Sequence, residues 1–189
     1  MKKIFKLIVC ILVCHVVATA AWSHMYFTPR DDIKSYLIDC IKQERKSIYA
    51  AIYMLTDKSI AQALLEAHLR GVDVVLVLDH VSMSERFGKG SFLQNNGVPV
   101  FVHHAANYNP FTMPIMHHKF FIFGLHEKYK KSLVWTGSFN CTVSASKYND
   151  ENVIVSDDAG LIKDYKYCFD TLVERLGGKK DWIAIFEEK

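Results

Sequence analysis

The sequence predicts an α/β domain with a mixed, largely parallel sheet flanked by helices. Two runs, 47–55 and 72–78, are rich in β-forming residues and apolar nearly throughout, as expected of strands covered on both faces. Two other segments, 31–45 and 57–69, carry apolar residues at helical spacing instead. Strands that alternate with helices in this way are typical of an α/β sandwich.

The remaining elements follow in chain order from the same patterns. Within the first helix, Ile33 and Leu37 recur on one face, and Gly71 ends the second helix. We expect strands at 25–27, 47–55, 72–78, 98–102, 118–123, 132–136 and 152–155. We expect helices at 31–45, 57–69, 90–96, 141–147 and 158–175.

The first 21 residues have the pattern of a secretory signal peptide. Three lysines lie at the start, an apolar run spans 7–21, and small residues close it, so that cleavage after Ala20 or Ala21 fits. The run falls short of the roughly 20 residues that span a bilayer, and an uncleaved membrane anchor is the alternative. We expect a secreted or periplasmic protein, membrane-anchored in the alternative, with a single domain over 22–189.

Composition and charge exclude several classes of protein. Half of the residues are hydrophobic and 23% are charged, which excludes a disordered, collagen-like or coiled-coil chain. The formal net charge is +3, but Lys2, Lys3 and Lys6 lie in the predicted signal peptide. Without them the chain carries 20 basic residues (23 minus 3) and 20 acidic ones. Nucleic-acid binding would therefore depend on a local basic patch rather than on bulk charge.

Three cysteines lie outside the predicted signal peptide: Cys40, Cys141 and Cys168. An odd count without C-x-x-C spacing indicates neither a zinc site nor a disulfide framework. We expect small buried hydrophobic side chains. One disulfide among the three is the alternative in an oxidising compartment, and the sequence does not choose the pair.

Polar residues with complementary chemistry cluster at the ends of three predicted strands. His117 and Lys119 share one face of a strand, because side chains alternate along it. An imidazole can attack phosphorus or move a proton, and an ammonium can hold a phosphoryl oxygen. Ser138 and Asn140 lie two residues apart after the next strand and offer a hydroxyl and an amide to a second oxygen. Glu151 precedes another strand, where its carboxylate can hold a histidine Nδ1–H.

Together these residues resemble the HKD motif of the phospholipase D superfamily. The match consists of His117-x-Lys119, then Gly137-Ser138-x-Asn140, then Glu151-Asn152 before a strand. The chain is most similar to the single-motif members, which are small secreted bacterial nucleases, phospholipase-D-like proteins and the mitochondrial cardiolipin hydrolase. The resemblance covers most of the chain after residue 21, so 22–189 is expected to be a phospholipase D-like catalytic domain.

This resemblance implies metal-independent phosphodiester hydrolysis with no cofactor. One histidine, His117, attacks phosphorus and forms a phosphohistidine, while a second histidine protonates the leaving oxygen and then activates water. Lys119, Ser138 and Asn140 bind the substrate and neutralise charge on its phosphoryl oxygens. Glu151 completes the expected catalytic set.

One copy of the motif per chain implies a homodimer with the active site at the two-fold interface, where both copies of His117 meet. His103, His104 or His118 is the alternative source of a second imidazole. The dense histidine group does not predict a metal site, because no suitably spaced carboxylates accompany it.

One position departs from the family pattern H-x-K-x4-D, in which the aspartate falls at Gly124 here. In the family that residue has a supporting role, so its loss affects local stability and strand geometry more than chemistry.

The sequence favours an endonuclease acting on nucleic acid, by a narrow margin. The alternative is a phospholipase D acting on membrane phospholipid, with an apolar rim at Phe111, Met113 and Ile115. A third hypothesis is an inactive binding module, suggested by Gly124.

Overall fold

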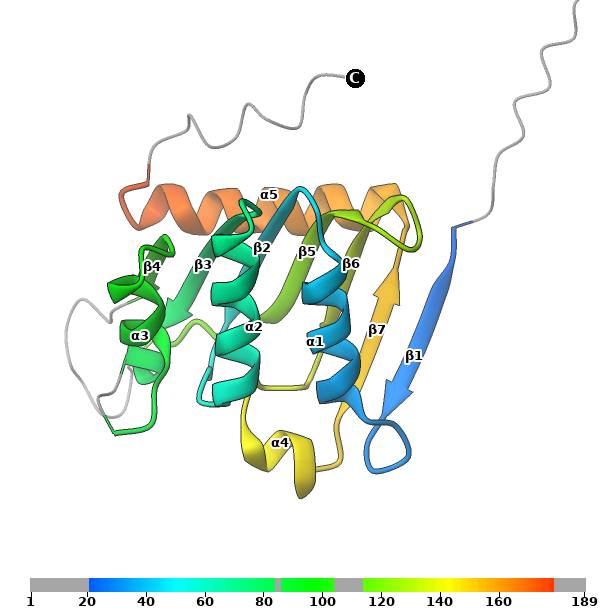
Figure 1. Ribbon diagram of the computed structural model, residues 1–189, viewed down its shortest axis with the longest axis horizontal. Helices are drawn as coiled ribbons and strands as arrows, with labels where there is room; N and C mark the ends of the chain where they lie inside the picture. The colour runs from blue at the N-terminus through cyan, green and yellow to red at the C-terminus, as the bar shows by residue number, and fades with distance from the viewer. Residues whose placement is uncertain (1–20, 84–85, 104–113, 179–189) are drawn as a thin grey trace, which may run out of the picture.

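A seven-stranded sheet forms the centre of the structure, in the order β1-β7-β6-β5-β2-β3-β4 (Figure 1). The computed structural model describes residues 21–83, 86–103 and 114–178. The strands are β1 (Ser23–Phe27), β2 (Ser47–Ile52), β3 (Asp73–Asp79), β4 (Val100–His103), β5 (Lys119–His126), β6 (Lys131–Gly137) and β7 (Asn152–Ser156). The helices are α1 (Ile33–Gln43), α2 (Lys58–Leu69), α3 (Gly90–Asn95), α4 (Val143–Lys147) and α5 (Ala159–Arg175), with a short 3-10 helix η1 (His80–Met83).

The sheet is mixed, as predicted, but it is less parallel than predicted. Among the described strands, β2 pairs with β3 and β3 with β4 in parallel. The other four pairings, β2 with β5, β5 with β6, β6 with β7 and β1 with β7, are antiparallel. The expectation of a largely parallel sheet was wrong, because local hydrophobic pattern reports burial and not strand direction. A short turn joins β5 to β6, and such a turn connects only antiparallel neighbours.

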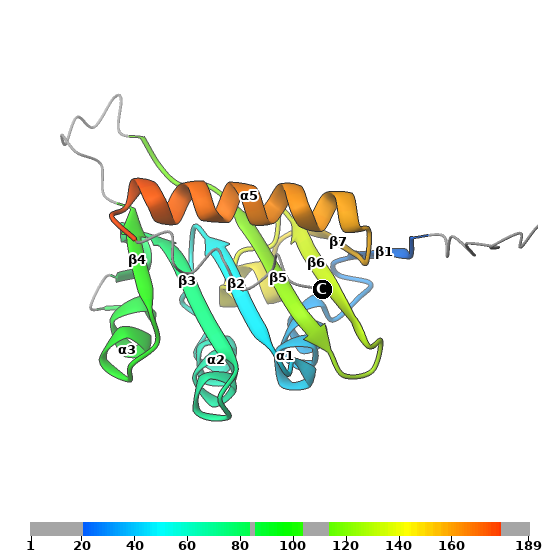
Figure 2. The ribbon, with the colours of Figure 1, turned by 90° about the horizontal axis from the view of Figure 1, so that it is seen from above.

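Both faces of the central strands are buried, which confirms the prediction for these two apolar runs. β2 is buried at all six positions and β3 at six of its seven. Helices α1 and α2 cover one face, where Leu37 and Leu64 belong to the larger core cluster. Helix α5 covers the other face with Phe169 and Leu172. Figure 2 shows α1, α2 and α3 on one side of the sheet and α5 lying along the other.

The predicted elements are all present, with ends that differ by a few residues. β5 extends three residues beyond its predicted end, to His126. In β2 the apolar run continues to Leu55, but the strand ends at Ile52. Leu55 instead forms a bridge with Cys141 and donates its N–H to Ser82, at 2.9 Å. The predicted signal peptide lies outside the described residues except for Ala21. Within the described ranges, no helix is long and apolar enough to cross a membrane.

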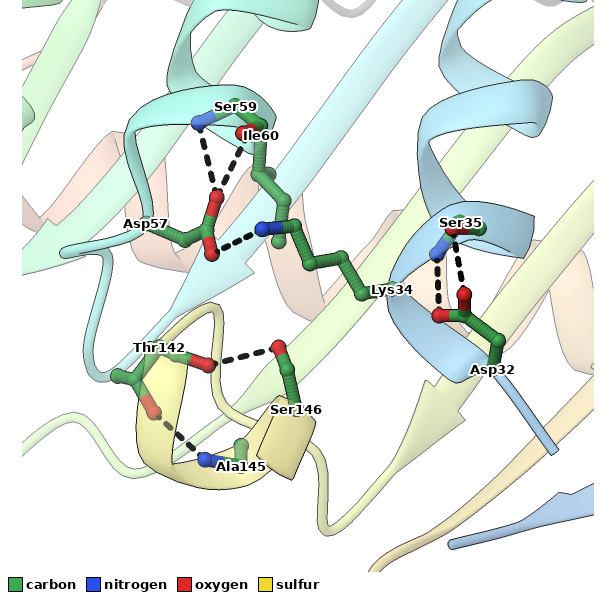
Figure 3. Close-up of polar contacts among 9 residues, drawn as sticks. All are labelled: Asp32, Lys34, Ser35, Asp57, Ser59, Ile60, Thr142, Ala145 and Ser146. Atoms are coloured by element: carbon green, nitrogen blue, oxygen red, sulfur yellow. Dashed lines mark hydrogen bonds and ion pairs between the residues drawn. The ribbon is translucent and has the colours of Figure 1, made fainter. Parts of the chain in front are cut away.

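Three helices begin near one another at one edge of the sheet, each with a capping side chain (Figure 3). The N-caps are Asp32 of α1, Asp57 of α2 and Thr142 of α4, and each accepts a backbone N–H of its helix. Lys34 of α1 reaches Asp57 at 2.7 Å and joins two of these helix ends. The Asp57 backbone N–H donates to the Cys141 carbonyl at 2.9 Å and joins the third. This edge is thereby fixed by local hydrogen bonds of the kind that favour helix initiation.

The three described cysteines are free, and the structure contains no disulfide among them. Cys40 and Cys141 are buried, as predicted, while Cys168 is half-buried. Burial raises the pKa of the Cys40 thiol to about 12, so the group is an inert hydrophobic side chain.

A buried histidine lies at the end of β5. His126 is 1% exposed, and its ring centroid lies 4.8 Å from that of Tyr129. Its Nδ1 atom is buried with no hydrogen-bond partner among the described residues. Burial lowers the pKa of this imidazole below its ordinary value. Folding therefore favours the neutral ring.

The stability of the protein is expected to fall on acidification through His126. A base whose pKa is lowered by folding contributes stability that is complete above its unfolded pKa and is lost as the pH falls toward the folded one. Between about pH 7.5 and about pH 5, His126→Phe should lose less free energy of unfolding than the wild type. Urea denaturation at both pH values measures this. His24→Phe, at an exposed histidine of β1, is the control and should keep the wild-type pH dependence.

Candidate active site

The predicted site residues lie along one edge of the sheet, the lower edge in Figure 1. Antiparallel pairing places Lys119, at the start of β5, opposite Ile52 at the end of β2. Gly137, at the end of β6, pairs with Val153 near the start of β7. The order of the sheet therefore puts three chain segments, distant in sequence, at neighbouring positions on this edge.

His117 and Lys119 contact each other, as their alternation along the chain predicts. The Lys119 Nζ atom lies 3.2 Å from His117 Nδ1 and 2.8 Å from the His117 carbonyl oxygen. An ammonium in this position donates to Nδ1, so the neutral ring carries its proton on Nε2. Burial lowers the pKa of Lys119, and the nearby charge of Glu151 opposes that shift. The lysine is therefore half-buried and held close to an exposed imidazole.

Tyr53, just beyond β2, is a site residue that the sequence analysis missed. Its ring centroid lies 4.5 Å from that of His117, and the Lys119 Nζ atom lies 5.2 Å from the same ring. Its backbone N–H donates to the His118 carbonyl at 2.8 Å. A tyrosine that directly follows a buried strand is the signal that could have identified it.

His118 points away from this site, as expected of the residue between His117 and Lys119. Its ring packs edge-on against Phe120 at 5.6 Å, and its Nε2 atom lies 3.9 Å from Cys168 of α5. Burial lowers the pKa of His118, with the charge of Lys119 adding to the effect. This histidine belongs to the interface with α5.

Glu151 lies on the same edge, where its described side-chain partners are Ser138 and Asn149. The Ser138 hydroxyl donates to one Glu151 oxygen, and the Asn149 amide donates to the other at 3.0 Å. Ser138 Oγ in turn accepts the Asn152 N–H at 3.0 Å. Within one chain the carboxylate therefore orients Ser138.

Asn140 carries a polar atom that the fold leaves unpaired. Its Oδ1 atom is buried and has no hydrogen-bond partner among the described residues. A buried amide oxygen without a partner is costly, by about 1–3 kcal/mol, and the partner it lacks is a hydrogen-bond donor. Its neighbour Cys141 is fixed by a hydrogen bond from its N–H to the Met54 carbonyl at 3.0 Å. The backbone next to Asn140 is thus fixed.

Gly124 lies far from this edge. Five residues separate it from Lys119 along β5, which corresponds to roughly 16 Å. A Cβ atom at Gly124 would lie 2.3 Å from Ser47 Oγ, so the position is packed against the start of β2. A buried carboxylate is nevertheless present at that end, because Glu44 Oε1 accepts the backbone N–H groups of Lys46, Ser47 and Leu125. The departure from the family pattern therefore lies at the other end of β5 from His117 and Lys119.

Within the described ranges, no group of three or more His, Cys, Asp and Glu side chains is placed to hold a metal ion. Of the histidine group, His104 lies outside those ranges, together with Phe111 and Met113 of the predicted apolar rim. Ile115 of that rim is described and is 47% exposed.

Comparison with known proteins identifies the family. The family described as "Cardiolipin synthase, PLD-like domain" matches residues 37–173. The chain therefore belongs to the phospholipase D superfamily of phosphodiesterases, as the HKD-like motif predicted.

Individual relatives agree with this assignment. "Phospholipase D" of Rickettsia bellii is 36% identical over 139 residues, which is 74% of this chain and 63% of the relative. "Mitochondrial cardiolipin hydrolase" of Xenopus tropicalis is 30% identical over 142 residues, or 75% of this chain and 61% of the relative. The chain thus aligns with less than two thirds of the length of these relatives. Nuc from Salmonella typhimurium, a phospholipase D family member, superposes with a TM-score of 0.67 at 25% identity, over 82% of this chain and 95% of Nuc.

Gly137 is expected to be required for the geometry of this site. A Cβ atom there would lie 2.0 Å from the Asn152 carbonyl oxygen and 2.8 Å from Val153 Cα, both in the backbone of β7. Gly137→Ala should therefore force β6 and β7 apart and destabilise the protein by about 1–3 kcal/mol, as measured by urea denaturation. Gly160→Ala is the control, because its nearest neighbour is a side-chain oxygen at 3.1 Å. Equal stability of the two variants would contradict the close approach of β6 to β7.

Proposed function

We propose that the protein hydrolyses phosphodiester bonds without a metal ion, with His117 as the nucleophile. The observation that carries this proposal is the contact of His117 with Lys119 on the same edge as the Ser138–Glu151 pair. In the first step, His117 Nε2 attacks phosphorus and the bond to the leaving oxygen breaks as a second imidazole donates a proton to that oxygen. In the second step, water attacks phosphorus, the phosphorus–nitrogen bond breaks, and the same imidazole takes the proton of the water.

Three side chains have the chemistry to stabilise the transition state. The Lys119 ammonium, the Ser138 hydroxyl and the Asn140 amide can each bind a phosphoryl oxygen whose charge grows during attack. Ser138 has a single hydroxyl proton, which it donates to Glu151 in the structure. To bind a phosphoryl oxygen, the hydroxyl turns from Glu151 toward the substrate.

The contact between Lys119 and His117 belongs to the state without substrate. With an ammonium donating to Nδ1, the ring proton occupies Nε2, and that nitrogen has no free lone pair for attack. A phosphoryl oxygen that binds Lys119 releases Nδ1 to take the proton. Substrate binding thereby prepares the nucleophile.

A two-fold homodimer supplies the second imidazole. The chain carries one copy of the motif, and two of the alternative histidines, His118 and His103, lie against other parts of the fold. His118 packs against α5, and His103 Nδ1 faces Asp79 at 3.6 Å. A partner's copy of His117, brought to the same edge by the two-fold axis, completes the pair.

Membrane phospholipid is the substrate class that the surface supports best. Exposed apolar side chains surround the site edge, namely Phe27 at the end of β1, Ile115 beside His117, and Val143 and Tyr148 of the α4 segment. An aromatic and aliphatic rim of this kind suits a lipid interface. The name of the Rickettsia bellii relative, "Phospholipase D", agrees with this choice.

Nucleic acid is the second candidate, and it was the first choice from sequence. The likeness to Nuc covers nearly the whole of that chain and supports it. The basic cluster at Lys128, Lys130 and Lys131 does not, because it lies at the far end of β5, about 20 Å from Lys119. Lys131 is also paired with Asp157 at 2.6 Å.

One assay with two substrate arms tests this function. Purified protein in excess EDTA receives mixed phospholipid vesicles in one arm and plasmid DNA and RNA in the other. Headgroup release is expected, and His117→Ala should lower it at least about a thousandfold, because the nucleophile is lost. The adjacent His118→Gln is the matched control and should keep activity, since that ring lies on the other face of β5.

The outcomes separate the candidates. Nucleic-acid cleavage without headgroup release would replace the lipid proposal with the nuclease. Activity that is present without EDTA and lost in EDTA would contradict a metal-free reaction. Absence of wild-type activity on either substrate, with or without EDTA, would favour the inactive binding module. Ile115→Ser with Tyr148→Ser should slow vesicle hydrolysis while leaving turnover of the soluble diester bis(4-nitrophenyl) phosphate unchanged.

We further propose that the protein is exported and cleaved after Ala21. The described fold supports this position, because β1 begins at Ser23 and the Trp22 backbone N–H donates to Asp157 Oδ1 at 2.5 Å. Cleavage after Ala21 converts that amide into an ammonium facing a carboxylate that is 6% exposed. N-terminal sequencing of the protein expressed in a bacterium should begin at Trp22. An intact N-terminus in the membrane fraction would establish the anchor instead.

A further inference from the structure

Asp79, the last residue of β3, is a wholly buried carboxylate that the proposed chemistry does not use. Its Oδ2 atom accepts the backbone N–H of Met116 at 2.9 Å. Its Oδ1 atom accepts the backbone N–H of Val81 at 3.2 Å. One side chain thus joins the end of β3 to the residue immediately before His117.

Two imidazoles flank the same carboxylate. His80 Nδ1 lies 2.9 Å from Asp79 Oδ1, and His103 Nδ1 lies 3.6 Å from Asp79 Oδ2. His103 is the residue of β4 that pairs with Asp79 in register. Neither of these ring nitrogens forms a hydrogen bond among the described residues. The hydrogen bonds that orient the carboxylate therefore come from the backbone N–H groups of Val81 and Met116.

His117 lies between two anchored residues. Met116 is fixed by its N–H on Asp79 and by its side chain, which is 3% exposed in the smaller core cluster. On the other side, the His118 carbonyl accepts the N–H of Tyr53. The His117 backbone is thereby held at both neighbours, and its ring rests against Tyr53.

The backbone of Tyr53 is itself held by η1, the segment that follows Asp79. Ser82, three residues after Asp79 in η1, donates its hydroxyl to the Tyr53 carbonyl at 2.9 Å. Ser82 Oγ also accepts the Leu55 N–H at 2.9 Å. The turn from β3 into η1 thus holds both segments that border His117.

We propose that Asp79 is a positioning residue for His117, acting through the Met116 N–H; this rests on the proposed function, in which His117 attacks phosphorus. Attack in line with the leaving group tolerates little misplacement, and an error of about 1 Å can cost about a hundredfold in rate. Loss of the acceptor would leave a buried N–H unpaired at the residue next to the nucleophile. The segment would then shift to recover a partner, and the imidazole would move with it.

The test compares three substitutions with the full-length wild type on bis(4-nitrophenyl) phosphate. Asp79→Ala removes the acceptor and should lower kcat about a hundredfold while KM stays within about twofold. Asp79→Asn keeps a carbonyl oxygen for the Met116 N–H and should retain most of kcat. Glu44→Ala is the matched control, because Glu44 is also wholly buried and also accepts backbone N–H groups, but at the opposite edge of the sheet. It should lower stability and leave kcat of the folded fraction unchanged.

A second readout does not depend on activity. The Met116 amide should be protected from hydrogen exchange in the wild type and in Asp79→Asn, and unprotected in Asp79→Ala. The NMR resonances of the His117 ring should shift only in Asp79→Ala. Rapid exchange of Met116 in the wild type would overturn the proposal, as would equal kcat losses in Asp79→Ala and Glu44→Ala. If the wild type hydrolyses no diester, the proposed function fails, while the exchange and ring measurements still decide whether Asp79 positions His117.

Discussion

Burial of both faces of the central strands determines where this protein can place its polar chemistry. β2 and most of β3 and β5 have no solvent-exposed side chains, because α1 and α2 cover one face and α5 the other. A charged side chain within those strands would lose its water, and burying it without a partner is costly. The charged groups of the site therefore occur at strand ends, where the chain leaves the sheet. The sheet order then decides which ends meet.

Buried carboxylates at both edges show how the fold tolerates charge inside. At one edge, Glu44 accepts backbone N–H groups. At the other edge, Asp79 accepts a backbone N–H and Glu151 accepts a side-chain hydroxyl. Each of them satisfies N–H or hydroxyl groups at points where a strand ends and its ladder of hydrogen bonds stops. The family pattern would place an acid at residue 124, and here the carboxylate of Glu44 accepts the N–H of the next residue, Leu125.

The sequence predicted what depends on local pattern and missed what depends on pairing. The contact of His117 with Lys119 followed from alternation along one strand. The contact of Ser138 with Glu151 was not predicted, because it requires β6 and β7 to be antiparallel neighbours, and hydrophobic pattern carries no strand direction. Asp79 was missed for a similar reason, since its partner Met116 lies 37 residues away. A charged residue that ends an apolar run was the available signal.

The side chains proposed to meet the substrate differ in exposure from the side chains that hold them. His117 and Ser138 are exposed, whereas Asp79 and Glu151, which hold their surroundings, are buried. Buried supports exclude water from the hydrogen bonds that set geometry, so those bonds are stronger than the same bonds at the surface. The exposed His117 and Ser138 are thereby held by buried neighbours. In the dimer proposed above, two copies would bring together edges whose supporting hydrogen bonds each chain already forms.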